Sequence, residues 1–121
     1  MRKKILVIDD SKAILEVIQI MLEEKGYLVK ILDHTEDVFR EVEGFGPDLI
    51  ILDVWMPALS GKDITKKLKQ ADSTKNIPII IFSALTKNQA SEEVKEADDY
   101  LSKPFEMEEL FEKVVKNISG G

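Results

Sequence analysis

Five side chains that could act on a charged oxygen group share one kind of position, directly after or close behind a short apolar run: Asp9, Asp10, Asp53, Ser83 and Lys103. Three carboxylates held close together repel one another, so each raises the pKa of its neighbours. Mg²⁺ would offset this repulsion, because this hard cation binds one or two carboxylates and keeps several waters. A hydroxyl can donate to an oxygen, and a lysine ammonium can pair with a phosphate. The set suits a phosphoryl group in transfer, with a carboxylate as the nucleophile that carries it.

Each of these residues taken singly has a simpler structural explanation. An aspartate after a strand is more often a helix N-cap than a ligand, and Asp9-Asp10 could cap a first helix. Lys103 alone would be a solvated lysine. Their shared placement behind apolar runs is what favours a functional site.

Five apolar runs must form the framework that positions these side chains: Ile5–Ile8, Leu28–Leu32, Leu49–Leu52, Ile79–Phe82 and the weaker Tyr100-Leu101. Three of them are continuous stretches of four large apolar residues, several of them β-branched. Such runs predict strands that are buried on both faces, as in a parallel sheet, rather than strands with one face in water.

Apolar residues at helical spacing lie between these runs and after the last one: Ile14–Leu22, Val38–Val42, Ile64–Leu68, Ala90–Ala97 and Leu110–Ile118. For the first helix, Asp10 or Ser11 is the candidate N-cap and Gly26 the stop. For the second helix, we expect Thr35 as the cap and an end near Gly44. Strands and helices therefore alternate along the whole chain.

The fourth predicted helix, Asn88–Glu96, has the weakest pattern. Its apolar side offers only Ala90, Val94 and Ala97, and no glycine stands before Asp98 to end it. We expect this helix to be short, irregular or mobile.

The alternation of strands and helices predicts the fold class. Right-handed crossovers between consecutive strands give a parallel sheet that is covered on both faces. We expect a flavodoxin-like doubly wound five-stranded parallel sheet in the order 2-1-3-4-5, with five helices. In such sheets ligands bind beyond the carboxyl ends of the strands, which is where the five polar side chains are expected.

Composition limits the kind of protein. The chain has 121 residues, one domain by the usual prior, with 44% hydrophobic and 33% charged residues. It has no cysteine and a single histidine, so disulfides, thiolate metal sites and a multi-histidine zinc site are excluded. That histidine, His34, is expected in a surface loop without a catalytic role. A net charge of −6 argues against direct nucleic-acid binding, and the short apolar runs argue against membrane insertion.

Four motifs, in this order and at this spacing, resemble those of response-regulator receiver domains of two-component signalling, of the kind seen in chemotaxis regulators: Val7–Ser11, Pro47–Pro57 with Gly61, Pro78–Ala84 and Asp98–Phe105. The resemblance runs from Ile5 to about Ile118. It implies one receiver domain over residues 1–119, followed by a flexible C-terminal end at Gly120-Gly121.

The resemblance implies roles for the acidic residues. Asp53 would be the phosphorylation site and nucleophile. Asp10, Asp53 and the backbone carbonyl of Trp55 would ligate Mg²⁺, and Asp9 would support the metal through water.

The same resemblance implies roles for the remaining motif residues. Ser83 and Lys103 would bind phosphoryl oxygens, with the Lys103-Pro104 peptide in the cis form. Tyr100 would be an aromatic switch that turns inward as Ser83 moves toward the phosphoryl group. Gly61 would shape the loop after the acceptor by adopting backbone angles that are closed to other residues.

The implied function is that of a cytoplasmic signalling module rather than an enzyme with a separate substrate. A sensor histidine kinase or a phosphotransfer protein would donate the phosphoryl group to Asp53, and a downstream effector protein would read the switched surface. Trp55 and Leu85 flank the site, and neither can orient a water as an amide or a carboxylate could. We therefore expect a long-lived aspartyl phosphate.

Three other functions are compatible with parts of the sequence. A Mg²⁺-dependent phosphatase of the haloacid-dehalogenase type also uses an aspartate nucleophile, but it needs two aspartates separated by one residue, whereas Asp9 and Asp10 are adjacent. A flavodoxin-type flavin carrier needs a hydroxyl-rich phosphate loop where these carboxylates stand. A receiver-like scaffold that is never phosphorylated would not need the complete residue set.

Charge is distributed unevenly along the chain. Lys62, Lys66 and Lys69 recur at helical spacing, and glutamates and aspartates crowd the last third. The simpler explanation of both charge runs is that they form solvated helix faces. The alternative is that a basic partner docks on the acidic last third of the chain.

Overall fold

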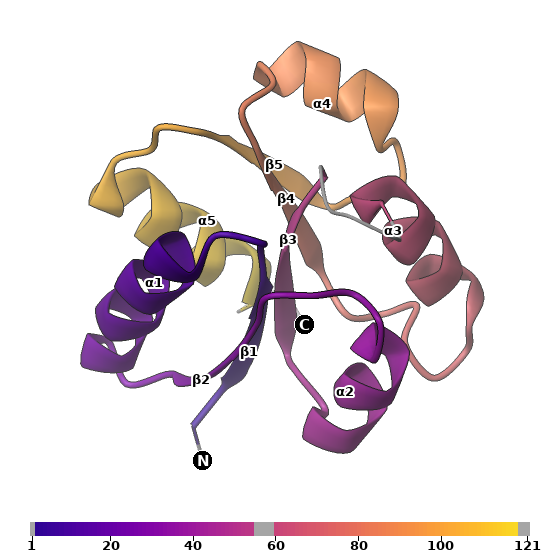
Figure 1. The fold of residues 1–121 in the computed structure, drawn as a ribbon, viewed down its shortest axis with the longest axis horizontal. Helices are drawn as coiled ribbons and strands as arrows, with labels where there is room; N and C mark the ends of the chain where they lie inside the picture. The colour runs from indigo at the N-terminus through magenta and orange to yellow at the C-terminus, as the bar shows by residue number, and fades with distance from the viewer. Residues whose placement is uncertain (1, 55–59, 119–121) are drawn as a thin grey trace.

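A computed structural model describes residues 2–54 and 60–118 of the chain as a three-layer α/β structure (Figure 1). Five parallel strands form its central sheet: β1 (Lys4–Ile8), β2 (Leu28–Leu32), β3 (Leu49–Asp53), β4 (Ile79–Ser83) and β5 (Asp99–Ser102). Their spatial order is β2-β1-β3-β4-β5. This arrangement confirms the predicted flavodoxin-like doubly wound sheet.

Five helices connect and follow the strands: α1 (Lys12–Glu24), α2 (Val38–Phe45), α3 (Gly61–Gln70), α4 (Lys87–Glu93) and α5 (Met107–Ile118). Helices α1 and α5 cover one face of the sheet, and α2, α3 and α4 lie on the other (Figure 1). Among the described helices, none is both long enough and apolar enough to cross a membrane.

The continuous apolar runs are explained by a core on each side of the sheet. In β1, Ile5 and Val7 join the core under α1 and α5, whereas Leu6 and Ile8 join the core under α2, α3 and α4. All four side chains are fully buried. Alternate side chains of a strand point to opposite faces, so a strand covered on both sides must be apolar at every position.

The helix ends agree with the sequence for α1 and differ for α2. Ser11 is the N-cap of α1, where its side chain accepts from the backbone of Ile14, and Gly26 follows the helix with a positive φ of 93°. Helix α2 begins only at Val38, so Thr35 is not its cap. It ends before Gly46, whose φ of 64° is left-handed, rather than near Gly44. Glycine meets that left-handed geometry without strain, which sets the end of the helix.

Helix α4 is short, as predicted. Thr86 and Gln89 form a reciprocal capping box at its start, and it ends after seven residues. The backbone leaves the helical region at Val94, with φ −128° and ψ 79°. Ala90 and Val94 bury its narrow apolar side against the sheet.

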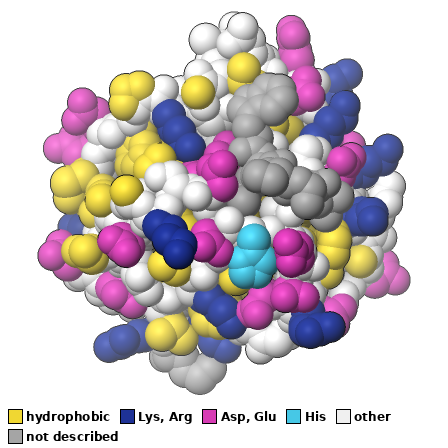
Figure 2. All heavy atoms as spheres, in the orientation of Figure 1, with side chains coloured by type: hydrophobic (Ala, Val, Ile, Leu, Met, Phe, Trp, Pro, Cys, Tyr) yellow, Lys and Arg dark blue, Asp and Glu magenta, His cyan; other side chains and the backbone are white. Residues whose placement is uncertain are grey.

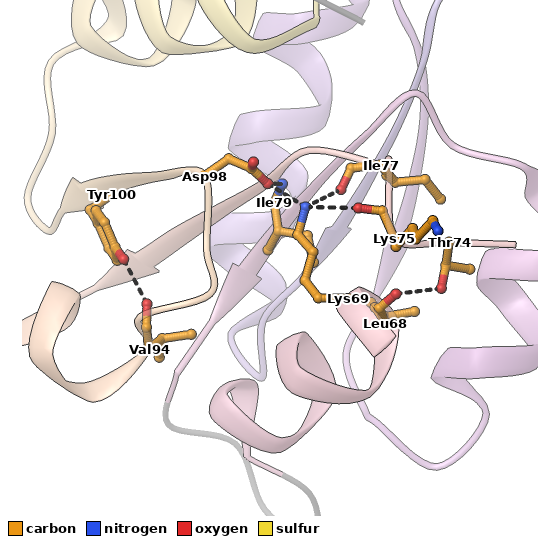
Figure 3. A network of polar contacts seen from close by, with 9 residues as sticks. All are labelled: Leu68, Lys69, Thr74, Lys75, Ile77, Ile79, Val94, Asp98 and Tyr100. Carbon is orange, nitrogen blue, oxygen red and sulfur yellow. Dashed lines mark hydrogen bonds and ion pairs between the residues drawn. The ribbon is translucent and has the colours of Figure 1, made fainter. Parts of the chain in front are cut away.

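A network of polar contacts joins α3 to the start of β4 and β5 (Figure 3). Lys69 Nζ donates to Asp98 Oδ2 at 2.6 Å and to the backbone oxygen of Ile77 at 2.9 Å. Asp98 Oδ2 also accepts from the backbone nitrogen of Ile79 at 2.8 Å. The expectation of a solvated lysine face on α3 is therefore wrong for Lys69, whose side chain is only 17% exposed.

Candidate functional site

The sheet topology brings three of the predicted site residues to one rim. Asp53 ends β3, Ser83 ends β4, and Asp9 directly follows β1. Because β1, β3 and β4 are parallel neighbours in the sheet, their carboxyl ends lie side by side. Lys103 follows β5 at the same rim.

The carboxylates form one cluster. Asp9, Asp10 and Asp53 each offer an oxygen, and these oxygens all lie within 4.8 Å of one another. Asp9 is 0% exposed and Asp53 is 5% exposed, whereas Asp10 is open to solvent. Two buried carboxylates and one accessible one make a site that a cation can reach from the solvent side.

Lys103 is the cation that this cluster holds in the structure. Its Nζ lies 2.7 Å from Asp9 Oδ2 and 3.4 Å from Asp53 Oδ2. The other oxygen of Asp9, Oδ1, accepts from the backbone nitrogen of Ser11 at 2.9 Å, which ties the carboxylate to the start of α1. One ammonium balances only part of the charge of three carboxylates.

An oxygen-binding divalent cation fits this donor set. Three clustered carboxylates provide the hard oxygen ligands that Mg²⁺ prefers, and the solvent side leaves room for waters. The carboxylates of Asp9, Asp10 and Asp53 would hold the ion. The predicted contribution of the Trp55 backbone carbonyl lies outside the described residues.

Ser83 and Lys103 are joined through the backbone. The amide nitrogen of Lys103 donates to the carbonyl oxygen of Ser83 at 2.6 Å. The hydroxyl oxygen of Ser83 accepts from the amide of Leu85 at 3.0 Å. The Lys103-Pro104 peptide is cis, as the resemblance implied. The end of β4 and the loop after β5 therefore bring Ser83 and Lys103 together at the rim where the ammonium meets the carboxylates.

Gly61 is needed for a different reason from the one expected. Its φ is not in the left-handed region, so unusual backbone angles do not explain it. A Cβ at this position would lie 2.5 Å from the backbone oxygen of Asp53 and 2.8 Å from the Cα of Val54. Gly61 thus lets the start of α3 approach the strand end that carries Asp53.

Tyr100 connects β5 to the end of α4. Its hydroxyl donates to the backbone oxygen of Val94 at 2.6 Å (Figure 3). The side chain is half-buried against the core under α2, α3 and α4. Burial, followed by the negative charges of Glu96, Asp98 and Asp99, raises the pKa of the Tyr100 hydroxyl. A hydroxyl that stays protonated can keep this hydrogen bond.

Asp99 is a buried charged residue to which the sequence assigned no role. Its carboxylate accepts from Lys113 Nζ and from Asn117 Nδ2, each at 3.0 Å, and from the backbone nitrogen of Tyr100 at 2.9 Å. Burial raises the pKa of this carboxyl, but these bonds outweigh it, so the pKa is lowered overall. In the sequence, the helical spacing of Lys113, Lys116 and Asn117 could have indicated a helix face that binds a buried carboxylate.

His34 lies in an exposed loop after β2, as expected. A hydrogen bond of 2.8 Å between His34 Nδ1 and Asp33 Oδ1 raises the pKa of the imidazole and lowers the pKa of the Asp33 carboxyl. Figure 2 shows this histidine with acidic side chains around it on the face that is drawn. It is not part of the carboxylate cluster.

The comparisons with known proteins agree with this arrangement. The family described as the response regulator receiver domain matches residues 5–115. The chain belongs to the response-regulator receiver family.

The chain is 37% identical over 118 residues to the alkaline phosphatase synthesis transcriptional regulatory protein PhoP of Bacillus subtilis, a match that covers 94% of the chain and 48% of that relative. The phosphate regulon transcriptional regulatory protein PhoB of Pseudomonas aeruginosa is 36% identical, over 89% of the chain and 48% of that relative. The chain thus spans about half the length of these curated relatives.

Solved receiver-type structures match almost the whole chain. The Vibrio cholerae chemotaxis protein CheY4 matches with a TM-score of 0.89 and 27% identity, over 97% of this chain and 99% of that one. The response regulator TrrA of Thermotoga maritima, solved in complex with Mg²⁺-BeF, matches with a TM-score of 0.84 and 32% identity, over 94% and 97%. The receiver fold and its role as a signalling module are therefore shared with characterised proteins.

Proposed function

We propose that this receiver domain takes a phosphoryl group on Asp53 from the phosphohistidine of a sensor histidine kinase or a phosphotransfer protein, in a Mg²⁺-dependent reaction. The observation that carries the proposal is the position of Lys103, whose ammonium lies 3.4 Å from the Asp53 carboxylate inside the acidic cluster. A fixed cation beside the nucleophile is what an incoming phosphoryl group needs.

The proposed transfer uses the residues at this rim. An Asp53 carboxylate oxygen forms a bond to phosphorus while the bond from phosphorus to the donor imidazole nitrogen breaks, and the electron pair leaves with that nitrogen. Lys103 Nζ and the Ser83 hydroxyl would bind phosphoryl oxygens. Bound Mg²⁺ would offset the negative charge of the phosphoryl oxygens and of the carboxylates. The same residues are proposed to catalyse the hydrolysis that later removes the group.

Phosphorylation would then change the surface that an effector protein reads. It adds ≈ −1.5 to −2 charges at a cluster that is already acidic. The new oxygens would draw in Ser83 and Lys103, and Tyr100 would respond because it links β5 to the end of α4. We propose that the output surface comprises α4 and β5, that the partners are proteins rather than nucleic acid, and that the domain acts in the cytoplasm.

The test is phosphorylation by acetyl phosphate with Mg²⁺, followed by intact mass. Wild-type chain should gain one phosphoryl group, and Asp53→Ala should gain none. Asp33→Asn is the matched control, because Asp33 is a partly exposed carboxylate outside the cluster, and it should react like wild type. Equal phosphorylation of Asp53→Ala and wild type would refute the assignment. Turnover of a small phosphate ester by wild type would favour the phosphatase instead.

A further inference from the structure

Phe82 lies against the Lys103 ammonium from the side of the core. Its ring centroid is 4.4 Å from Lys103 Nζ. The side chain is fully buried, next to the last position of β4. A cation at this distance is attracted by the negative face of an aromatic ring. The Lys103 ammonium therefore has three attractive neighbours, which are Asp9, Asp53 and the Phe82 ring.

The Phe82 ring is itself held in place. Phe105, two residues after Lys103, packs against it edge-on, with centroids 5.1 Å apart and an interplanar angle of 70°. Both rings belong to the packing of the core under α1 and α5. A groove of about 490 Å³ lies beside them and is lined in part by Phe82, Lys103 and Phe105. Lys103 and the two aromatic residues therefore border the same groove.

We infer that Phe82 is a positioning residue, which keeps the Lys103 ammonium in the acidic pocket when the carboxylates of Asp9 and Asp53 bind a divalent cation. The inference rests on the proposed function. Carboxylates that bind such a cation attract the ammonium less, and the like charge beside them repels it. The ring carries no net charge, so its attraction for the ammonium persists. Lys103 then stays beside Asp53, where the phosphoryl oxygens would arrive.

A purely structural role for Phe82 makes a different prediction. If the ring served only to fill the core, Phe82→Leu would lower stability more than Phe105→Leu, because Phe82 is fully buried and Phe105 only partly, and neither substitution would move the Lys103 ammonium. Both substitutions remove the edge-on contact between the rings. Only Phe82 has its ring beneath the ammonium among the aromatic residues that the structure describes. Phe105→Leu is therefore the matched control.

The direct test is an NMR measurement of the Lys103 ε-methylene protons, assigned from their loss in Lys103→Arg. Ring current should shift these signals upfield, and the shift should survive addition of Mg²⁺ in wild type and in Phe105→Leu. In Phe82→Leu with Mg²⁺, the signals should move to the positions of a solvated lysine. Absence of the upfield shift in wild type with Mg²⁺ would overturn the inference, and this outcome does not depend on a substitution of the buried Phe82.

The kinetic consequence is measured with acetyl phosphate at saturating Mg²⁺. Phe82→Leu should lower the rate constant of phosphorylation about 3- to 10-fold, the size expected for a partly desolvated cation–ring contact. Phe105→Leu should lower the rate constant less than Phe82→Leu does, because it leaves the Phe82 ring beneath the ammonium. Equal rates for wild type and Phe82→Leu would overturn the inference. A wild-type chain that accepts no phosphoryl group would instead refute the proposed function, while the NMR shift would still decide where Lys103 lies.

Discussion

Gly61 lies so close to the end of β3 that it has no room for a side chain. A methyl group there would lie 2.5 Å from the backbone oxygen of Asp53. That oxygen belongs to the backbone and cannot move away as the end of a flexible side chain could. We expect Gly61→Ala to lower the free energy of unfolding by about 1–3 kcal/mol, the usual cost of overpacking. It should also slow phosphorylation, because the strain falls on the residue that carries the nucleophile. Urea denaturation and the acetyl phosphate reaction measure the two effects.

Gly44 provides the control for this substitution. It lies within α2, its φ is not left-handed, and a Cβ there would meet nothing within 4 Å. Gly44→Ala should raise the free energy of unfolding by about 0.5–1 kcal/mol, because alanine is the better helix residue. If the two substitutions changed stability equally, the close approach at Gly61 would not be what requires glycine.

The residues two positions after Asp53 and Ser83 in the sequence, Trp55 and Leu85, bear on how long an aspartyl phosphate lasts. Leu85 is apolar and half-buried, and Trp55, outside the described residues, is apolar as well. Neither can orient an attacking water as an amide or a carboxylate could, so we expect the phosphorylated state to outlast a few seconds in Mg²⁺. Trp55→Asn should shorten its half-life, whereas Trp55→Phe should not. The decay of the phosphorylated chain, followed by intact mass, measures these half-lives. Equal half-lives for wild type and Trp55→Asn would contradict the expectation that Trp55 slows hydrolysis.

At the scale of elements, Asp99 fastens β5 to α5. Its carboxylate is 5% exposed, lies 3.0 Å from Lys113 Nζ and accepts a further bond from Asn117. Asp99→Asn should lower the free energy of unfolding at pH 7 by about 1–3 kcal/mol, because it removes the charge that these donors bind. Asp72→Asn is the control, since Asp72 forms an exposed pair with Lys75, and it should change stability by at most about 0.5 kcal/mol.

The pH dependence of the Asp99 effect follows from its lowered pKa. A carboxyl whose pKa is lower in the folded chain stabilises that state above its unfolded pKa of about 3.9, and this contribution is lost as pH falls through the folded value. The stability difference between wild type and Asp99→Asn should therefore be constant from pH 7 to about pH 5 and shrink below about pH 4. Urea titrations at several pH values measure it, and a difference that grew on acidification would contradict the sign.

Helix α4 depends on its neighbours for its existence. A helix of seven residues is too short to be stable alone in water. Its ends are fixed by the Thr86 capping box and by the Tyr100 hydroxyl on Val94, and its apolar side by Ala90. A movement of Tyr100 therefore removes one of the few contacts that define where α4 ends.

At the scale of the molecule, the sequence predicted the sheet order and the meeting of the site residues. The apolar runs indicated strands covered on both faces, and parallel neighbours necessarily bring Asp9, Asp53 and Ser83 to one rim. The strand-end placement also predicted Lys103 at this edge, and its ammonium lies there in contact with Asp9 and Asp53. These features depend on the order of strands and helices, which can be predicted from the pattern of hydrophobic residues along the chain.

The features that the sequence did not predict depend on contacts between distant segments. Thr35 has a capping side chain, but its backbone carbonyl accepts from Val38 before the helix begins. Lys69 reads as a surface lysine, and only the folded chain places Asp98 within its reach. Val115 belongs to an apolar stripe yet is 53% exposed, because the sheet beneath α5 covers only a narrow strip of the helix.

The acidic cluster also couples ion binding to the stability of the whole fold. Three carboxylates within 4.8 Å of one another repel, so Mg²⁺ should raise the melting temperature. At a concentration 100 times its dissociation constant the gain is about 2.7 kcal/mol. Asp10→Asn should be more stable than wild type in EDTA and gain less from Mg²⁺, whereas Asp33→Asn should behave like wild type. Equal Mg²⁺ responses of wild type and Asp10→Asn, by calorimetry, would contradict a metal role for Asp10.

The last described residue, Ile118, shares a surface hollow with Lys3, Pro47 and Pro78, all of which lie just before the strands begin. The reactive carboxylates lie where those strands finish. Lys3 and Ile118 therefore lie at the pole of the domain opposite the chemistry. A reporter group attached next to either residue would leave the carboxylate cluster open to solvent, so reporter fusions at this pole should not block access to Asp53.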